Sequence, residues 1–420
     1  MRIALIGQPN YRHTKRLILW QLRALPHDFI IFDTHDGATT MIGDDLPKNV
    51  QFLEVPKLDM EALLPALAGL SVDQIISFSD RGVVPAAQLR ETRRLQGNSV
   101  DTENIVVNKA ATRKRLCEAG LSRVQHRITD PTHLERDAAD FAVPFIVKPT
   151  SASGSLGVEL VQSHEDLPGY LSRYRNNKIL GAAAGIDQKS SFNNGALVLE
   201  SFIDGNEFSV EGVVIDGRIL FLGITASHTS QVPFFVGIGH DFQPCRPSDE
   251  LENYTQSVVN ALGMTFCPFH IEMMKTSSGY EVIEAHTRFG GGLMMELVAA
   301  GTGFSPFSGY IELLLGKEFS GLSEASGVFS QHYLCTEEAG PVDRISLSNA
   351  VINDPRIISY ALDYNPGDVI ESGVIPLCRL GYVTFSAKNA HEAQAFRSLI
   401  DSHLEIQIQA QGLVQSGGIS

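Results

Sequence analysis

The sequence has 420 residues, of which 43% are hydrophobic and 19% are charged, and its formal net charge is −15. This hydrophobic content excludes an intrinsically disordered chain, and the length predicts two or three domains. The negative charge argues against nucleic acid as a partner, because a basic surface is needed to offset backbone phosphates.

The cysteines and the N-terminus indicate the compartment. Five cysteines are scattered along the chain without CxxC spacing, which argues against a disulfide framework or a zinc site. The first residues, MRIALIGQPN, form too short an apolar run for a signal peptide, and no apolar stretch approaches the length of a membrane span. We therefore expect a cytoplasmic protein that does not bind membranes.

Short apolar runs alternate with helical segments in residues 1–105. Strands are expected at residues 2–6, 29–33, 50–55 and 74–78, and helices near 13–25, 59–69 and 83–96. The alternation predicts a small α/β domain with a largely parallel sheet. Asp80 and Arg81 follow the fourth strand, where open α/β sheets bind ligands, although helix capping and a surface charge pair is the more ordinary interpretation of both residues.

Residues 106–185 contain a basic helix and a loop of small residues. Lys109 begins the helix, and the basic residues that follow, Arg113 among them, are expected mostly on a solvated face. Lys148 ends a strand, and Thr150–Gly157 after it is rich in hydroxyl groups and glycine. Such a loop can fold over phosphates with its backbone N–H groups, but alone it is more often a flexible hairpin, and it is not a Walker A loop.

Residues 186–310 are predicted to form mostly β-structure. A polar insertion at 188–194 is expected to be mobile, and a strand–turn–strand–turn–strand pattern follows it over 196–224. Residues 226–244 are predicted to form a long loop, which in a compact domain is often functional. Glu211, on the second of these strands, either faces a site or is a solvated strand residue.

The stretch from His270 to Gly292 carries the strongest chemical signal. Polar and apolar residues alternate on both sides of the turn sequence Ser277–Gly279, which predicts a β-hairpin. Glu272 and Glu284 would then lie on neighbouring strands and point the same way, and a cation between them would relieve their repulsion. Mg²⁺ suits two such carboxylates together with phosphate oxygens. An ordinary hairpin with solvated charges is the alternative on these residues alone.

The residues after the hairpin predict further anion contacts and a final subdomain. Arg288 is close enough in sequence to reach an anion held by the metal, and the glycines at 290–292 lead into a predicted helix at 293–300 whose N-terminal amides could bind another anion. Beyond it we expect a helix near 307–315, strands near 328–334, and a strand followed by a helix within 374–400. Residues 409–420 are expected to be poorly ordered.

The order of these features resembles the ATP-grasp superfamily, and most of all its carboxylate–amine ligase branch, which includes the L-amino acid ligases that make dipeptides. Lys109, Lys148, the Ser/Gly loop, ESFIDGNEFSVE, HIEM and IEAHTRFGG occur in the family's order, over nearly the whole chain. The resemblance implies an α/β and α+β protein, with the nucleotide held between the two halves of its core. The implied segments are an N-terminal α/β domain at 1–105, a small ATP-grasp subdomain at 106–185, a large one with the metal site at 186–310, and a C-terminal α+β subdomain at 311–420.

The resemblance also implies roles toward ATP and Mg²⁺, with Mn²⁺ as a second candidate metal. Lys109 and Lys148 would contact the α- and β-phosphates and the base. The loop that closes over the terminal phosphates would contain Ser151, Ser153, Gly154 and Ser155. The implied nucleoside contacts are Glu200 and the backbone of Ser201 and Ile203 with adenine, and Glu207 with the ribose hydroxyls. Glu272 and Glu284 would hold the metal, and Arg288 would be the catalytic residue that stabilises charge on the transferring phosphoryl group.

Two positions depart from the family pattern. Many relatives have Asn where this chain has His286, and a neutral imidazole is a weaker ligand for Mg²⁺ than an amide oxygen, so His286 either binds substrate or orients a neighbour. Relatives often carry a carboxylate three residues before His240, where this chain has Gly237. His240 is thus a candidate substrate contact or a structural histidine. The implied substrate contacts are His240, His286, Gly291 and Gly292.

The function implied by the resemblance is that of an ADP-forming ligase that joins a carboxylic acid, an amino acid in our expectation, to an amine through an acyl phosphate. Its partners would be small-molecule substrates, and relatives are often homodimers. One alternative is another ATP-grasp enzyme that uses a small acid such as formate; Phe234 and Phe235, if they line the pocket, favour a larger substrate. A second alternative is a non-catalytic nucleotide sensor, against which the complete set of Glu272, Glu284 and Arg288 argues.

Overall fold

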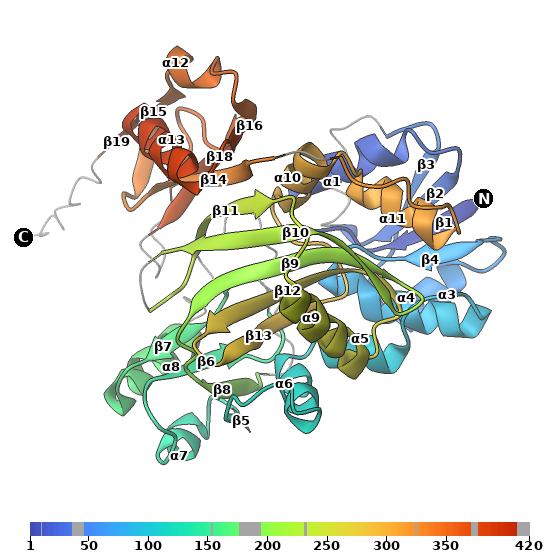
Figure 1. Cartoon of the computed structure of the whole chain (residues 1–420), viewed down its shortest axis with the longest axis horizontal. Helices are drawn as coiled ribbons and strands as arrows, with labels where there is room; N and C mark the ends of the chain where they lie inside the picture. The colour runs from blue at the N-terminus through green and yellow to red at the C-terminus, as the bar shows by residue number, and fades with distance from the viewer. Residues whose placement is uncertain are drawn as a thin grey trace, which may run out of the picture.

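The computed structural model describes residues 1–9, 11–35, 46–152, 154–175, 195–230, 233–323, 326–370 and 377–409, and Figure 1 shows the whole chain. The expectations for residues 188–194 and 410–420 and for Ser153 therefore lie outside the described residues. None of the described helices is long and apolar enough to cross a membrane.

The N-terminal region is a four-stranded parallel sheet with helices on both faces, which confirms the predicted α/β alternation. Its strands follow the order β3-β2-β1-β4. The elements are β1 (Arg2–Ile6), α1 (Arg12–Leu22), β2 (Asp28–Asp33), β3 (Val50–Glu54), α3 (Met60–Ala66), β4 (Gln74–Ile76) and α4 (Asp80–Arg93). Successive strand residues face opposite sides, so Ile3 and Leu5 pack with α1 while Ala4 and Ile6 pack with α3 and α4.

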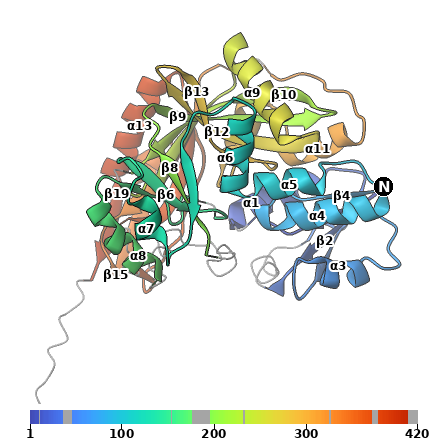
Figure 2. The same cartoon turned by 90° about the horizontal axis from the view of Figure 1, so that it is seen from below.

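A second, antiparallel sheet of four strands has the order β5-β8-β6-β7. The elements of this region are α5 (Val100–Val106), α6 (Lys109–Glu118), β5 (His126–Thr129), α7 (Leu134–Ala138), β6 (Phe145–Pro149), β7 (Glu159–Val161), η1 (His164–Asp166), α8 (Leu167–Arg175) and β8 (Leu197–Ser201). β8 follows residue 185, so the sheet takes one strand from beyond the segment boundary expected there. In Figure 2 this sheet and the N-terminal sheet lie at opposite sides of the view.

The centre of the molecule is a curved sheet of eight strands in the order β13-β12-β9-β10-β11-β14-β18-β16 (Figure 1). Its strands are β9 (Asn206–Ile215), β10 (Arg218–Thr229), β11 (Gly237–Gln243), β12 (Phe266–Thr276), β13 (Gly279–His286), β14 (Val328–Thr336), β16 (Ile357–Leu362) and β18 (Cys378–Ala387). The prediction of one long loop at 226–244 is wrong over most of its length. β11 is a strand because it pairs with β10 on one side and with β14, about ninety residues onward, on the other.

The remaining helices and strands complete the core and the C-terminal region. They are α9 (Asp249–Leu262), α10 (Met294–Thr302), α11 (Pro306–Leu314), β15 (Gly340–Leu347), α12 (Asn349–Ile352), β17 (Val369–Ile370), α13 (Ala390–Ser402) and β19 (Leu404–Ile408). β17, β15 and β19 form a third sheet of three strands. The C-terminal region is thus α+β, as expected, and it shares β14, β16 and β18 with the central sheet.

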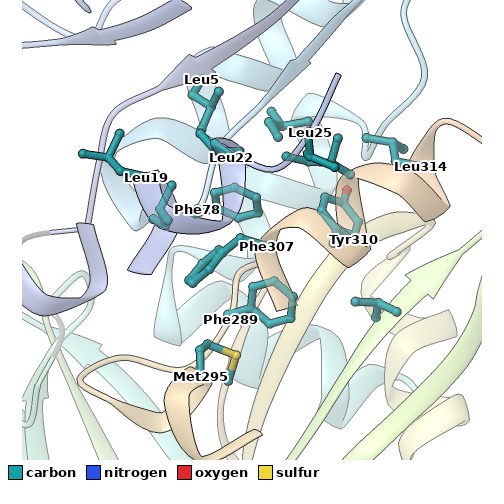
Figure 3. Close-up of a cluster of buried hydrophobic side chains, with 14 of the residues drawn as sticks. Leu5, Leu19, Leu22, Leu25, Phe78, Phe289, Met295, Phe307, Tyr310 and Leu314 are labelled. Carbon is teal, nitrogen blue, oxygen red and sulfur yellow. The ribbon is translucent and has the colours of Figure 1, made fainter. Parts of the chain in front are cut away.

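An apolar cluster fixes the N-terminal sheet against the end of the β12–β13 hairpin (Figure 3). Phe78, just after β4, contacts Phe289 and Phe307 with ring centroids 6.1 and 4.9 Å apart. All three side chains are at most 3% exposed. Burial of large rings is the main favourable contribution here, and it brings the residues after β4 next to those after β13.

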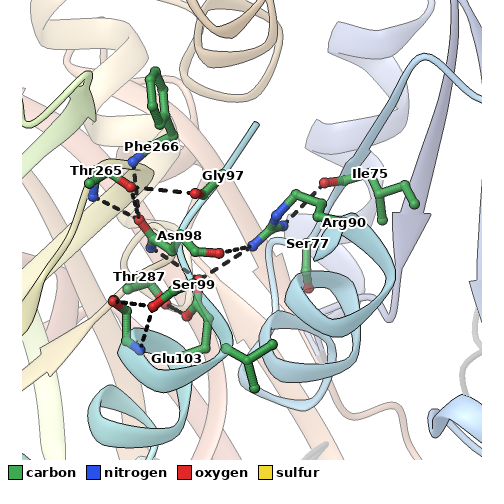
Figure 4. Close-up of polar contacts among 12 residues, drawn as sticks. Ile75, Ser77, Arg90, Gly97, Asn98, Ser99, Glu103, Thr265, Phe266 and Thr287 are labelled. Atoms are coloured by element: carbon green, nitrogen blue, oxygen red, sulfur yellow. Dashed lines mark hydrogen bonds and ion pairs between the residues drawn. The ribbon is translucent and has the colours of Figure 1, made fainter. Parts of the chain in front are cut away.

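A polar network supports the same junction (Figure 4). Asn98 Oδ1 accepts hydrogen bonds from the backbone N–H groups of Thr265 and Phe266, at 2.8 and 3.0 Å. Buried Glu103 accepts from Asn98 Nδ2 at 3.0 Å and from the hydroxyl of Thr287. Because Thr287 lies between His286 and Arg288, the network helps to fix the backbone that carries both side chains.

Candidate active site

The β12–β13 hairpin places Glu272 directly opposite Glu284. The strands are antiparallel, with Ile271 paired to Ala285 and Glu272 to Glu284, and a bulge follows at Met273. Directly opposed residues of antiparallel strands share one face, so the two carboxylates lie side by side. The predicted hairpin is confirmed, and so is the common direction of its two acidic side chains.

Positive groups surround Glu284. Lys109 Nζ lies 2.7 Å from Glu284 Oε1, and His286 Nε2 lies 3.3 Å from the same oxygen. Lys109 also donates a hydrogen bond to the carbonyl of Ala152 in the Ser/Gly loop. Lys109, expected at a phosphate, therefore links the loop to the hairpin, and His286 contacts a carboxylate of the hairpin itself.

Arg288 is held by Asp80, which comes from the first turn of α4. Arg288 Nε and Nη2 donate to the two carboxylate oxygens at 2.7 and 2.6 Å, and His286 Nδ1 lies 3.2 Å from Oδ1. Burial alone would raise the pKa of Asp80, but the charges of Arg288 and His286 hold that pKa far below its usual range. Helix capping was the more ordinary interpretation of Asp80, and it is wrong: Asp80 belongs to the site.

Glu272 is paired with His270, for which the sequence pattern predicts only a place on a strand. His270 Nε2 lies 3.1 Å from Glu272 Oε1, and its Nδ1 lies 2.9 Å from Glu211 Oε1. Burial lowers the pKa of His270, but the charges of Glu211 and Glu272 outweigh this effect and raise the pKa to about 10. His270 is therefore a cation at neutral pH. Glu211 is fully buried, so the solvated-strand interpretation of Glu211 is wrong.

A second ionic cluster lies in the small sheet, at Glu200. Lys148 Nζ is 2.7 Å from Glu200 Oε2, and Arg113 donates from Nε and Nη2 at 2.9 and 3.2 Å. Burial would raise the pKa of Glu200, but the two cations lower it to about 2. Arg113 is only 2% exposed, so the expectation of a solvated face fails for this residue, whose acidic partner lies 87 positions away.

The Ser/Gly loop has the backbone conformation of a tight turn. Gly154, Ser155 and Gly157 all have positive φ, at 69°, 58° and 71°. Glycine adopts such angles freely, whereas Ser155 does so at some cost. Leu156, between Ser155 and Gly157, is buried against Tyr11 from the N-terminal region, whereas Gly154 is exposed. Ser151 is half-buried at the loop's start.

The residues expected at the nucleoside lie on β8 and β9. The N–H of Ser201 already donates to the carbonyl of Gln125 at 2.9 Å, and Ile203 is half-buried beyond the end of β8. Glu207 is close enough to Glu272 for their charges to interact: burial first, and then the charge of Glu272, raises the pKa of Glu207 to about 7. Contacts of Glu200, Ser201, Ile203 and Glu207 with a nucleotide remain predictions.

The expected substrate contacts lie beside the hairpin. His240 is opposite Gln331 on β14, and burial, followed by the charge of Arg379, lowers the pKa of His240 to about 4. Gly292 has φ 63°, and a β-carbon on it would lie 2.8 Å from the hydroxyl of Tyr333. Gly291 is exposed. The positive φ and the close approach together favour glycine at position 292.

Among the described residues, no group of three or more His, Cys, Asp and Glu side chains is arranged to hold a metal ion. Two opposed carboxylates nevertheless fit Mg²⁺, which often takes one or two protein carboxylates and completes its octahedron with phosphate oxygens and water. Each carboxylate here is paired with a cation, Glu284 with Lys109 and Glu272 with His270. A bound metal ion would compete with these pairs.

Known proteins resemble this chain in sequence and in fold. Residues 141–296 match the model of the ATP-grasp domain. Dapdiamide A synthase of Enterobacter agglomerans is 25% identical over 330 residues, 74% of either chain. The L-arginine-specific L-amino acid ligase of Bacillus subtilis is 22% identical over 337 residues, 78% of either chain. The crystal structure of an L-amino acid ligase from Bacillus licheniformis aligns with a TM-score of 0.78 at 21% identity, covering 97% of this chain and 99% of that one.

Proposed function

We propose that this chain, which carries an ATP-grasp domain, is an ADP-forming ligase that joins a carboxylic acid to an amine through an acyl phosphate. One observation supports the proposal most directly. Glu272 and Glu284 face each other on one hairpin, and Arg288, two residues after its last strand, is held by Asp80 beside them. Two carboxylates suited to a metal ion therefore lie beside a guanidinium whose orientation is fixed, and His286 links Glu284 to the Asp80–Arg288 pair.

The reaction has two steps. An oxygen of the substrate carboxylate attacks the γ-phosphorus of ATP, the bond to the bridging oxygen breaks, and ADP leaves. The nitrogen of the amine then attacks the carbonyl carbon of the acyl phosphate, inorganic phosphate leaves, and the nitrogen loses a proton. Negative charge develops near one place in both steps, where a fixed cation stabilises both transition states.

The residues of this chain would divide that work. Glu272 and Glu284 would hold Mg²⁺, or Mn²⁺, whose charge offsets that of the phosphate oxygens when it is bound. Arg288 would stabilise the transferring phosphoryl group, and Asp80 would keep its guanidinium in position. His270 would keep Glu272 oriented, since a ring held by a second carboxylate cannot rotate freely.

The nucleotide would lie between the small sheet and the central sheet. Lys109 and Lys148 would contact phosphates, and the Ser/Gly loop, including Ser151, Gly154 and Ser155, would cover them and exclude the water that hydrolyses an acyl phosphate. Glu200 would contact adenine, and Glu207 would bind the ribose hydroxyls. We propose that the segments 1–105, 106–185, 186–310 and 311–420 act as the structural units, with β8 belonging to the small subdomain.

We infer that both substrates are amino acids. The support lies in the relatives, which are named as an L-arginine-specific L-amino acid ligase and a dapdiamide synthase. Acyl phosphate formation is tested by hydroxylamine, a nucleophile that converts an acyl phosphate into a hydroxamate. Incubation with ATP, Mg²⁺, hydroxylamine and each amino acid in turn should give ADP and one or a few hydroxamates. ADP formation without a hydroxamate for any acid would contradict an acyl phosphate intermediate.

A further inference from the structure

Arg379, on β18, has no acidic partner among the residues that the structure describes. Its Nη2 donates to the carbonyl of Gly237 at 2.5 Å, and its guanidinium lies over the ring of Tyr333, 3.9 Å from the centroid. Tyr11 also lies near the guanidinium. Among the described residues, buried Arg379 Nε has no hydrogen-bond partner, and no carboxylate is among the groups whose charges act on Arg379. Removal of a charge from water without an opposite charge is unfavourable, so this guanidinium is suited to bind an anion.

Two more buried polar atoms lie on the adjacent strands. His240 Nδ1 on β11 and Gln331 Nε2 on β14 also have no hydrogen-bond partner. These two residues are direct cross-strand neighbours, and β18 is next to β14 in the sheet. Buried polar atoms in folded proteins almost always have a partner, either protein or ordered water, so three such atoms on three consecutive strands are available to a polar ligand at this face.

This patch is connected to the proposed reaction centre. The charges of both Arg379 and His270 act on His240, so the imidazole lies within electrostatic range of the patch and of the metal-site pair. Gly292, four residues after Arg288, approaches the Tyr333 hydroxyl so closely that a β-carbon would be 2.8 Å from it. Tyr11 lies near Arg379 and packs against Leu156 of the Ser/Gly loop. The ring of Tyr333, over which Arg379 lies, is therefore beside the turn that follows Arg288.

We propose that Arg379, with Tyr333, His240 and Gln331 around it, binds the carboxylate of the amine-bearing substrate, so that the acceptor is an amino acid rather than a simple amine. The inference rests on the proposed ligase function. The carboxylate that becomes phosphorylated must meet Arg288 and the metal-binding pair. A second cation on the other side of His240 fits a second carboxylate, and a two-point hold of that carboxylate would aim the amine of the same molecule at the acyl phosphate.

Because Gly237 has no side chain, position 237 supplies no group that could pair with the Arg379 guanidinium. A β-carbon at this position would lie 3.4 Å from Arg379 Nη2, which is ordinary van der Waals contact, and no other atom is closer than 4 Å. An aspartate there would reach the guanidinium and pair with it. Gly237→Asp should therefore compete with a substrate carboxylate, whereas Gly237→Asn places a side chain of the same shape without the charge.

The experiment uses the full chain with ATP, Mg²⁺ and the acid found by the hydroxamate screen. The second component is each of the twenty amino acids, the matching amino acid amide, or hydroxylamine. We expect the wild-type kcat/KM for the preferred amino acid to exceed that for its amide by about 10- to 100-fold, the value of a charged hydrogen-bonded contact. Arg379→Met should remove this preference and lower the ratio of peptide to hydroxamate by a similar factor. Gly237→Asp should do the same, Gly237→Asn should keep the preference, and the exposed Arg344→Met should behave as wild type.

Each outcome decides between the alternatives. A preference for the amino acid that survives in Arg379→Met, or its absence in the wild type, overturns the inference while the hydroxamate still supports the ligase. Loss of hydroxamate formation in Arg379→Met for acids with two carboxylates only would place the bound carboxylate on the acid substrate, and would overturn the assignment to the amine. No hydroxamate from the wild type with any acid contradicts the proposed function itself. If Arg379→Met does not fold, the wild-type preference and the two Gly237 variants decide.

Discussion

Asp80 and Arg288, 208 positions apart in the sequence, form a two-point ion pair in which the guanidinium donates from Nε and Nη2 at 2.7 and 2.6 Å. Asp80 begins α4 of the N-terminal region, and Arg288 follows the hairpin of the central sheet. The geometry fixes the plane of the guanidinium, which a single contact would not do. The N-terminal region thus takes part in positioning a proposed catalytic group.

Asp80→Asn should lower kcat by about 100-fold with little change in the KM for ATP. The reason is that a displaced Arg288 guanidinium stabilises the transition state less, while ATP binding is little affected. Steady-state ADP formation measures both constants. Asp80→Glu should recover part of the loss, and Asp101→Asn, at a side chain that is 81% exposed, should match the wild type. A rise in KM alone would mean that Asp80 does not position Arg288 for catalysis.

Glu272→Gln and Glu284→Gln should each weaken Mg²⁺-dependent ADP binding by at least about 10- to 100-fold, since a neutral amide replaces a proposed metal ligand. Calorimetric titration with ADP, with and without Mg²⁺, separates metal binding from nucleotide binding. The exposed Glu318→Gln is the matched control. Equal losses with and without Mg²⁺ would show that the two carboxylates do not hold a metal.

Asp241→Asn should lower the free energy of unfolding at pH 7 by about 2 kcal/mol. Arg397 Nη1 lies 2.6 Å from Asp241 Oδ1, and His228 and Ser330 also bond this carboxylate. Burial would raise the pKa of Asp241, but these partners lower it to about 2. Because the folded-state pKa is depressed, the stabilisation is complete above about pH 4 and is lost as the pH falls through 2.

Urea unfolding at pH 7, 4 and 3 measures this contribution. The difference between wild type and Asp241→Asn should be constant from pH 7 to pH 4 and smaller at pH 3. Asp343→Asn, at an exposed position on β15, should show no such difference. A difference that grows as the pH falls would contradict the depressed pKa.

Phe78→Ala should destabilise the protein by about 3–5 kcal/mol, the usual cost of removing a buried ring. Phe78 is 3% exposed and lies within the aromatic cluster that joins the N-terminal sheet to the region around Phe289. Thermal or urea unfolding is the measurement, and Ile128→Ala, at a 60% exposed residue, is the control. A loss below about 1 kcal/mol would mean that the cluster contributes little to the junction.

Local patterns in the sequence were enough to predict much of the fold. Alternation of strand and helix in residues 1–105 is a property of neighbouring residues, and the parallel sheet β3-β2-β1-β4 confirms it. The hairpin needs only a turn and two strands close in sequence, so the opposed pair Glu272 and Glu284 could also be predicted from the sequence.

The predictions that were wrong have a common physical cause: each depends on a partner that is far away in the sequence. β11 is a strand because of β14, Arg113 is buried because of Glu200, and Asp80 joins the site because of Arg288. His270 gave one usable signal, since it is two residues from Glu272 on the same face of a strand. Its second carboxylate, Glu211, lies 59 positions away on β9 and follows only from the sheet order.

The most direct test of the ligase proposal is ADP and phosphate release with ATP and Mg²⁺ across a pairwise matrix of the amino acids, with mass spectrometry of the products. The proposal predicts release that requires two amino acids and yields the mass of their dipeptide, and Glu284→Ala and Arg288→Ala should abolish both signals. ATP binding without release or a dipeptide mass in any pair would contradict amino acid ligation, and would favour a nucleotide sensor or an acid outside the amino acids.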